Sequence, residues 1–268
     1  MSVTTELRWT PQTLFRVSPP ARIGDANQTV MTIDSGTPPG TAALGVLLDD
    51  LLGFTLYDRR GDRAGLVTAE LSVDVVRPAA WQGPHLTAES RLEALDRDGG
   101  LSSARVQDSA GALVAIATLR GNFVDDVSPQ RTVVTAPGPD PQPLVGGLAG
   151  SPIDLLGGVL EATGSGVRLT VPGQEQLANA NGVMHGGVIT CAHDLAGTAA
   201  AAAGDIPMRA GSLRVNFFRA VPVDGPVVFD AETVRAGRRV AVTRVTARDH
   251  LGRTCSVATV TCRRDPAC

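Results

Sequence analysis

The chain contains no lysine, and all 24 of its basic residues are arginine. A Schiff-base lysine and a Walker-type lysine are therefore both absent, which excludes two large classes of enzyme. The four cysteines show no Cys-x-x-Cys spacing, so we expect reduced thiols. No cluster of His, Cys and carboxylate residues has the spacing of metal ligands, and we predict no metal site. Aromatic residues are few and scattered, and they predict no aryl pocket.

Charge and hydropathy narrow the class of protein further. The net charge is −3 at pH 7, which argues against a general nucleic-acid binder. No apolar run approaches 18 residues, so we expect no membrane span. The first residues, Met-Ser-Val-Thr-Thr-Glu-Leu-Arg, lack the apolar core of a signal peptide, and we expect a cytoplasmic protein. The 43% hydrophobic content is that of an ordinary globular protein with a substantial core.

The two halves of the chain repeat one another. Leu71-Ser-Val-Asp-Val-Val-Arg77 matches Leu213-Arg-Val-Asn-Phe-Phe-Arg219, with Leu, Val and Arg in the same register. Upstream, Asp50-Leu-Leu-Gly53 matches Asp194-Leu-Ala-Gly197. Several matches in the same order indicate a duplication. A Pro- and Gly-rich stretch separates the copies, so we predict units over 1–127 and 153–268 joined by a linker over 128–152.

Each copy has the same predicted plan. A short alternating strand precedes a helix, expected over 41–57 in the first copy and 185–203 in the second. Long alternating strands with hairpin signals between them follow each helix. An antiparallel meander with one embedded helix is an α+β unit, in which one face of the sheet packs on that helix.

The most informative stretch runs from Asn179 to Asp194. It places His185-Gly186-Gly187 at a predicted helix start, where unpaired backbone N–H groups carry positive dipole character and glycine permits close approach of a ligand. Such an amide can serve as an oxyanion hole, and an ionised aspartate can take a proton from water. Gly186 and Asp194 are separated by roughly 12 Å along a helix, so one small substrate carbonyl cannot touch both. A working site therefore needs two helices side by side.

Plainer interpretations exist for each of these residues. His-Gly-Gly alone is also typical of an ordinary helix start, and Asp194 alone is typical of a solvated or capping carboxylate. His193 is expected to point away from Asp194 and to be partly exposed. Arg238 and Arg239 flank a predicted hairpin turn, where they could either meet nucleotide phosphates or remain solvated.

The motif as a whole resembles the hotdog-fold acyl-CoA thioesterases, and most closely the phenylacetyl-CoA (PaaI) type. The resemblance covers about residues 160 to 264 and rests on these residues: Asn179, Gly182, His185, Gly186, Gly187, Asp194, Ser212 to Arg219, Arg238 and Arg239. It implies a long helix wrapped by an antiparallel sheet, working as a dimer with active sites between protomers. It also implies an acyl-CoA substrate, no cofactor and a homo-oligomer of pseudo-dimers.

The resemblance also implies roles for single residues. Gly186 would supply the oxyanion amide and His185 would help to place the carbonyl. Asn179 and an aspartate would hold and activate water, and Ser212 would assist that aspartate. Gly187 would lie against the substrate, as would Arg238 and Arg239.

The first half departs from the pattern, because Thr41-Ala42-Ala43 stands where His-Gly-Gly is expected and Glu70 replaces Ser212. If the halves pair, one composite site joins Asn179, His185 and Gly186 to Asp50. The other joins Asp194 and Ser212 to a loop of Pro38, Pro39, Gly40 and Thr41. We therefore expect two fused hotdog units with one competent and one degenerate site. The alternatives are a non-catalytic acyl-CoA-binding protein and a purely structural pseudo-dimer.

Overall fold

The computed structural model describes residues 9–33, 40–77, 81–125, 150–202 and 206–264. Most of the predicted linker, 128–152, lies outside these ranges. Ser151 and Pro152, which the prediction assigned to the linker, are instead the N-cap and the first residue of a short helix. The remaining domain boundaries stay predictions.

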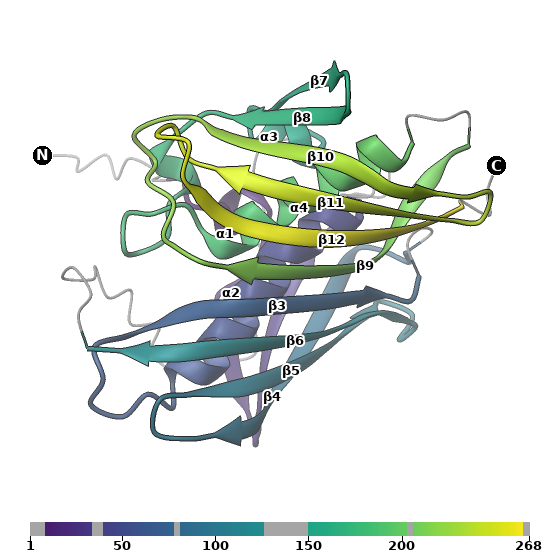
Figure 1. Ribbon diagram of the computed structural model, residues 1–268. Coiled ribbons are helices and arrows are strands. Elements are labelled where there is room, and N and C mark those ends of the chain that lie inside the picture. The colour runs from purple at the N-terminus through teal and green to yellow at the C-terminus, as the bar shows by residue number, and fades with distance from the viewer. Residues whose placement is uncertain (1–8, 34–39, 78–80, 126–149, 203–205, 265–268) are drawn as a thin grey trace, which may run out of the picture.

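The first unit contains one long helix and six strands (Figure 1). In chain order its elements are α1 (Pro11–Leu14), β1 (Ala21–Ile23), β2 (Ala26–Thr32), the 3-10 turn η1 (Thr41–Ala43), α2 (Leu44–Tyr57), β3 (Gly65–Val75), β4 (His85–Leu95), β5 (Gly99–Asp108) and β6 (Leu113–Val124).

The second unit repeats this order of elements. They are α3 (Pro152–Leu155), β7 (Val159–Thr163), β8 (Gly166–Val171), the 3-10 turn η2 (Glu175–Leu177), α4 (Gly186–Ala201), β9 (Met208–Phe217), β10 (Val227–Ala236), β11 (Val240–Arg248) and β12 (Thr254–Arg264). The predicted helices and hairpins are confirmed, with ends that differ by a few residues.

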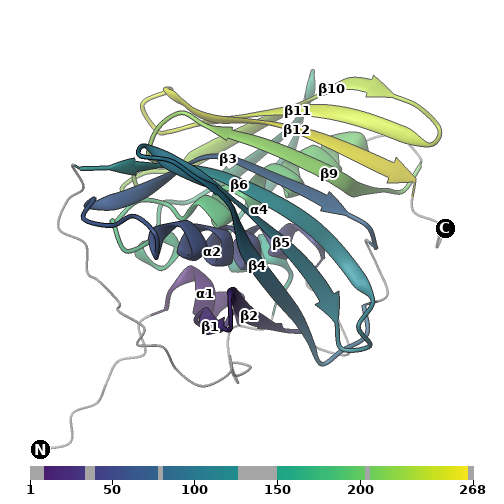
Figure 2. The ribbon, with the colours of Figure 1, turned by 90° about the horizontal axis from the view of Figure 1, so that it is seen from below.

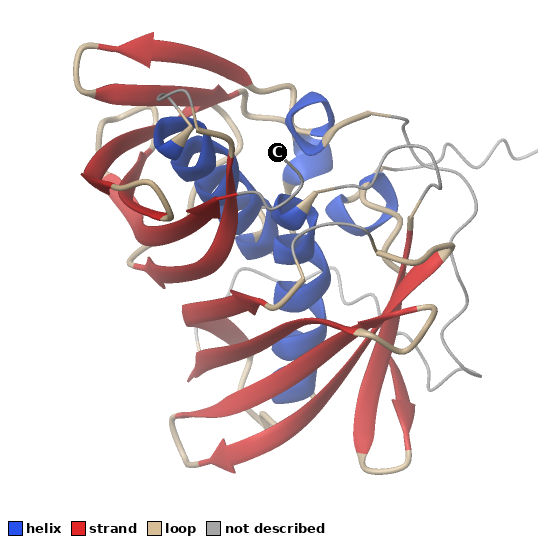
Figure 3. Cartoon of the chain, turned by 90° about the vertical axis from the view of Figure 1, so that its right-hand side faces the viewer, coloured by secondary structure: helices blue, strands red, loops and turns tan. Residues whose placement is uncertain are grey.

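All twelve strands form one antiparallel sheet in the order β1-β2-β4-β5-β6-β3-β9-β12-β11-β10-β8-β7. Read from either edge, the order of equivalent strands is the same, as a two-fold arrangement of two copies requires. The sheet curves over α2 and α4, which lie side by side against its inner face (Figures 2 and 3). This is the predicted pair of fused hotdog units, each with a helix wrapped by an antiparallel sheet.

The repeated sequence forms the seam between the units. Strands β3 and β9 pair antiparallel, with Leu71 opposite Val215 and Val73 opposite Leu213. Ser72 and Arg214, which are equivalent in the repeat, face each other at the centre of this pairing. The interface is therefore self-complementary, and the two units are paired as a pseudo-dimer within one chain.

The two long helices cross where each has a glycine. A Cβ on Gly45 would lie 2.8 Å from the Gly187 carbonyl oxygen, and a Cβ on Gly187 would lie 2.6 Å from the Val46 Cα. The backbones can approach this closely only because neither glycine carries a side chain. This contact brings the start of α4 against the first turn of α2.

The core differs from the sequence prediction at His193. The prediction expected a partly exposed side chain, but His193 is fully buried, its Nε2 lies 2.8 Å from the Ser256 hydroxyl, and its ring packs edge-on to Phe229. The helix turns its side chain about 100° away from that of Asp194, toward Phe229 and Ser256 of the sheet. The three described cysteines (Cys191, Cys255 and Cys262) are buried and unbridged, as predicted. Within the described ranges, no helix is both long and apolar enough to cross a membrane.

Candidate active site

The loop before α4 presents His185 at the helix start. His185 is the N-cap residue in extended conformation, and the Gly187 N–H lies 3.0 Å from its Nδ1. The loop is closed by Asn179, whose Oδ1 accepts a hydrogen bond from the Asn181 N–H at 2.9 Å, and by Gly182 with φ of +74°. Asn179 thus shapes the loop that carries the motif.

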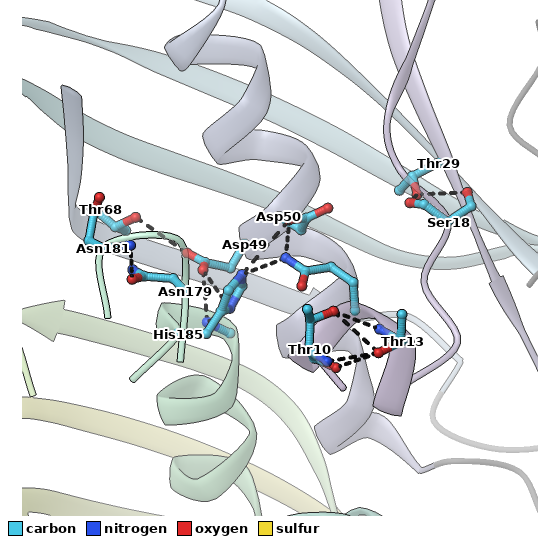
Figure 4. Close-up of polar contacts among 12 residues, drawn as sticks. Thr10, Thr13, Ser18, Thr29, Asp49, Asp50, Thr68, Asn179, Asn181 and His185 are labelled. Carbon is cyan, nitrogen blue, oxygen red and sulfur yellow. Dashed lines mark hydrogen bonds and ion pairs between the residues drawn. The ribbon is translucent and has the colours of Figure 1, made fainter. Parts of the chain in front are cut away.

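Two adjacent aspartates of α2 meet this loop (Figure 4). The Asp49 Oδ2 accepts a hydrogen bond of 2.8 Å from the Gly187 N–H and lies 3.3 Å from the His185 Nδ1. The Thr68 hydroxyl donates to the other oxygen of Asp49 at 3.3 Å. Both oxygens of Asp49 are therefore occupied, one by the second unit through Gly187 and the other by Thr68 of β3 in the first unit.

Asp50 has a different environment. Its Oδ1 accepts a hydrogen bond of 2.7 Å from the Gln12 side-chain amide and lies 3.8 Å from the His185 Nε2. Its Oδ2 is buried and has no hydrogen-bond partner among the described residues. A buried carboxylate oxygen without a partner calls for a group that completes its hydrogen bonding, such as a water molecule or a substrate atom.

Burial and mutual charge shift the ionisation of the cluster. Desolvation raises the pKa of Asp49, and the neighbouring Asp50 carboxylate raises it further, against the lowering effect of His185. Burial lowers the pKa of His185, but the hydrogen bond and charge of Asp50 and the charge of Asp49 outweigh it, so the pKa of His185 is raised above its ordinary value. Such paired perturbations concentrate at functional sites.

A cavity of about 770 Å³ opens at this cluster. The residues Gln12, Asp49, Asp50, Asn179, His185 and Gly186 line one end of it. The Gly186 N–H also has no acceptor among the described residues, as expected for the first turn of a helix. Gly186 and Asp50, which the composite-site hypothesis assigns to one site, therefore line the same cavity.

The cavity continues along α2. Asp50, Phe54 and Tyr57 lie on one face of the helix and line it, together with Phe217 and Phe218 at the end of β9. The chain has only six Phe, two Trp and one Tyr, so this cavity takes four of the nine. The expectation that the aromatic residues are too scattered to line one pocket was wrong.

The second composite site is smaller and less polar. Asp194 accepts hydrogen bonds of 2.8 Å from the hydroxyls of Thr41 and Thr198, beside a cavity of about 340 Å³. Burial raises the pKa of Asp194. Pro38 and Pro39, which the prediction placed in this loop, lie outside the described residues. Both oxygens of Asp194 are held by threonines, and Thr41 stands where the other site has His185.

Four predicted site residues line neither cavity: Gly187, Ser212, Arg238 and Arg239. Gly187 was expected to lie against the substrate, but it packs against the backbone of Gly45 and Val46 instead. Ser212 is not among the hydrogen-bond partners of Asp194 in the described chain. Arg238 and Arg239 are exposed in the turn between β10 and β11 and do not line the 770 Å³ cavity. The nearby Thr233 bonds to the Ala200 carbonyl, so this hairpin lies at the end of α4 opposite to His185.

Sequence reasoning missed Gln12, Asp49 and Thr68. Asp49 carried a signal, because two consecutive aspartates in an apolar helix are unusual, but the repeat matched only Asp50 to Asp194. Gln12 also carried one, because Pro11-Gln-Thr-Leu14 is repeated as Pro152-Ile-Asp-Leu155. Thr68 gave none, since a threonine in a strand is ordinary.

Comparison with known proteins relates both halves of the chain to thioesterases. The thioesterase superfamily model matches residues 181–256, and the acyl-CoA thioesterase C-terminal domain model matches residues 4–118, in the first half of this chain. None of the curated proteins matches the sequence.

Solved structures match almost the whole chain. The tesB protein of Mycobacterium avium subsp. paratuberculosis is 12% identical with a TM-score of 0.63, over 92% of this chain and 96% of that one. The acyl-CoA thioesterase II TesB2 of Mycobacterium marinum is 11% identical with a TM-score of 0.65, over 95% and 96%. These likenesses show the fold. The narrower PaaI-type assignment is only partly supported, because the structures that match almost the whole chain include an acyl-CoA thioesterase II and a putative thioesterase II. Taken together, the matches place the chain in the thioesterase superfamily, as a thioester hydrolase built from two fused hotdog units.

Proposed function

We propose that the 770 Å³ cavity hydrolyses acyl-CoA thioesters to free acid and CoA, and that Asp50 activates the attacking water. One observation carries this proposal: Asp50 and Gly186 line the same cavity, and neither the buried Asp50 Oδ2 nor the Gly186 N–H has a hydrogen-bond partner among the described residues. Asp49 is the poorer candidate, because the Gly187 N–H and the Thr68 hydroxyl already occupy its two oxygens.

The proposed reaction has two steps. Asp50 takes a proton from water while the water oxygen bonds to the thioester carbonyl carbon, and the Gly186 N–H stabilises the developing oxyanion. The tetrahedral intermediate then collapses, the carbon–sulfur bond breaks, and the proton passes from Asp50 to the leaving thiolate of CoA. In this proposal His185 keeps its expected role of orienting the carbonyl. Asn179 shapes the loop, in place of its expected role of holding water, because its Oδ1 already accepts the Asn181 N–H.

We further propose that each chain has one competent site. The second site has Thr41 in place of His185, and both oxygens of Asp194 accept hydrogen bonds from threonine hydroxyls. It therefore offers no free carboxylate oxygen of the kind found at Asp50. Assembly of several chains and a cytoplasmic location remain predictions from the sequence.

Thiol release from a panel of acyl-CoA substrates tests the activity. The wild type should turn over at least one of them, and Asp50→Asn should reduce kcat by about 10²- to 10⁴-fold, the usual contribution of a general base. Acyl-CoA binding without turnover on any substrate would contradict the proposal and favour the non-catalytic alternative.

A further inference from the structure

Gln12 reaches the catalytic cluster from a segment that precedes the first hotdog strand. Its side-chain Nε2 lies 2.7 Å from the Asp50 Oδ1 and 3.3 Å from the His185 Nε2, and the residue lines the 770 Å³ cavity. We propose that Gln12 is a positioning residue, which anchors Asp50 and sets the tautomer of His185. This inference rests on the proposed role of Asp50.

The helix that carries Gln12 is a single turn fixed at both ends. Thr10 and Thr13 form a capping box at its start, with Pro11 as its first residue. At its end the Val17 N–H donates to the Gln12 carbonyl at 2.8 Å and the Arg16 N–H donates to the Thr13 carbonyl at 3.3 Å. This is a Schellman motif, and Arg16 takes the left-handed conformation that it needs, with φ of +55°. An isolated turn of helix is unstable in water, so these caps are what hold Gln12 in place.

The segment after α1 is tied to the sheet as well (Figure 4). The Ser18 N–H donates to the Val30 carbonyl, and the Val30 N–H donates to the Ser18 hydroxyl at 3.0 Å. Leu14 and Phe15 are buried in the core. The backbone of Gln12 is therefore braced against the first unit, while its side chain points to the loop of the second.

The donors and acceptors fix how Gln12 acts. An ionised carboxylate only accepts hydrogen bonds, so the amide presents its NH₂ group to Asp50. An amide nitrogen only donates, so the 3.3 Å contact of the Gln12 Nε2 with the His185 Nε2 makes that ring nitrogen the acceptor and assigns the ring proton of neutral His185 to Nδ1. That proton faces the Asp49 Oδ2, 3.3 Å away. The Gly187 N–H lies near both the His185 Nδ1 and the Asp49 Oδ2. Because the protonated Nδ1 cannot accept a hydrogen bond, the Gly187 N–H donates to Asp49 at 2.8 Å.

The second unit shows that the fold does not require glutamine at this position. Helix α3 repeats α1, with a capping box between Ser151 and Asp154 and with Gly157 in the left-handed conformation at φ of +61°. The Gly158 N–H donates to the Ile153 carbonyl at 2.9 Å, as the Val17 N–H does to Gln12. Ile153 thus stands at the position of Gln12. The short helix therefore carries an amide, Gln12, in the first unit and an aliphatic side chain, Ile153, in the second.

Matched substitutions test the role of Gln12. Gln12→Met keeps the length of the side chain and removes both donors, and Ile153→Met makes the same residue at the equivalent position of α3. We expect Gln12→Met to lower kcat for thioester hydrolysis by about 10- to 100-fold, which is the range for losing a hydrogen bond to a charged group. We expect the thermal midpoint of unfolding of Gln12→Met to equal that of Ile153→Met. We expect Ile153→Met to keep wild-type kcat.

A second measurement does not depend on activity. The ¹⁵N spectrum of the histidine rings reports the tautomer of His185, whose signals are assigned by their absence from His185→Gln. In the wild type at high pH we expect the proton on Nδ1, and in Gln12→Met a loss of that preference. An unchanged kcat together with an unchanged tautomer in Gln12→Met would overturn the inference, as would an equal loss of kcat in Ile153→Met. If the wild type hydrolyses no thioester, the proposed function fails while the spectrum still tests Gln12.

Discussion

The close crossing of α2 and α4 makes a sharp prediction for Gly45→Ala. The new Cβ would lie 2.8 Å from the Gly187 carbonyl oxygen and 3.0 Å from the Cys191 nitrogen, and both are backbone atoms that cannot rotate away. Overpacking of this kind costs about 1–3 kcal/mol. Alanine also gains about 1 kcal/mol over glycine in helix propensity, which masks part of the cost.

Gly53→Ala on the same helix supplies the correction, because a Cβ there would meet no atom within 4 Å. Both variants gain helix propensity, so their difference isolates the steric term. We expect Gly45→Ala to be less stable than Gly53→Ala by about 1–3 kcal/mol in urea unfolding, and to weaken the Gly187–Asp49 bond and hence activity. Equal stability of the two variants would refute the account of the helix crossing.

Three further predictions follow from the same geometry. Asp49→Asn should weaken the hydrogen bond from the Gly187 N–H and lower both kcat and the thermal midpoint of unfolding. Asp50→Asn should lower kcat with a smaller effect on the thermal midpoint. Burial lowers the pKa of His193 to about 3, so the stability due to its neutral form is present above about pH 6.5 and lost as the pH falls toward 3. Between pH 7.5 and 5 the wild type should lose about 2 kcal/mol more than His193→Gln in urea unfolding. Phe54→Ala should raise kcat/KM for bulky acyl groups relative to short ones in a substrate panel, and an unchanged ratio would place the acyl group elsewhere.

The duplicated fold could be predicted because the repeat lies in the residues that form the seam. Leu71 and Leu213 are equivalent in the sequence repeat. In the structure Leu71 faces Val215 and Leu213 faces Val73. The roughly 12 Å separation along one helix also predicted that Gly186 and Asp194 do not meet one substrate carbonyl, and in the structure they line different cavities. Both inferences depend on local geometry, which periodicity fixes well.

The rest of the site depends on contacts between distant segments. Gln12 meets His185 across 173 residues, and no local pattern encodes that contact. Asp49 and Asp50 are neighbours in sequence and both line the cavity, and only their contacts with Gln12, Thr68 and Gly187 decide which carboxylate keeps an unpartnered oxygen. The clustering of four aromatic side chains arises in the same way, because they come from α2 and from the end of β9.

The central claim is that the working site joins the loop of the second unit to an aspartate of the first. The most direct measurement compares kcat for thiol release in Asp50→Asn and Asp194→Asn under identical conditions. The account predicts loss of activity in Asp50→Asn and nearly full activity in Asp194→Asn. Full activity in Asp50→Asn with loss in Asp194→Asn would contradict it.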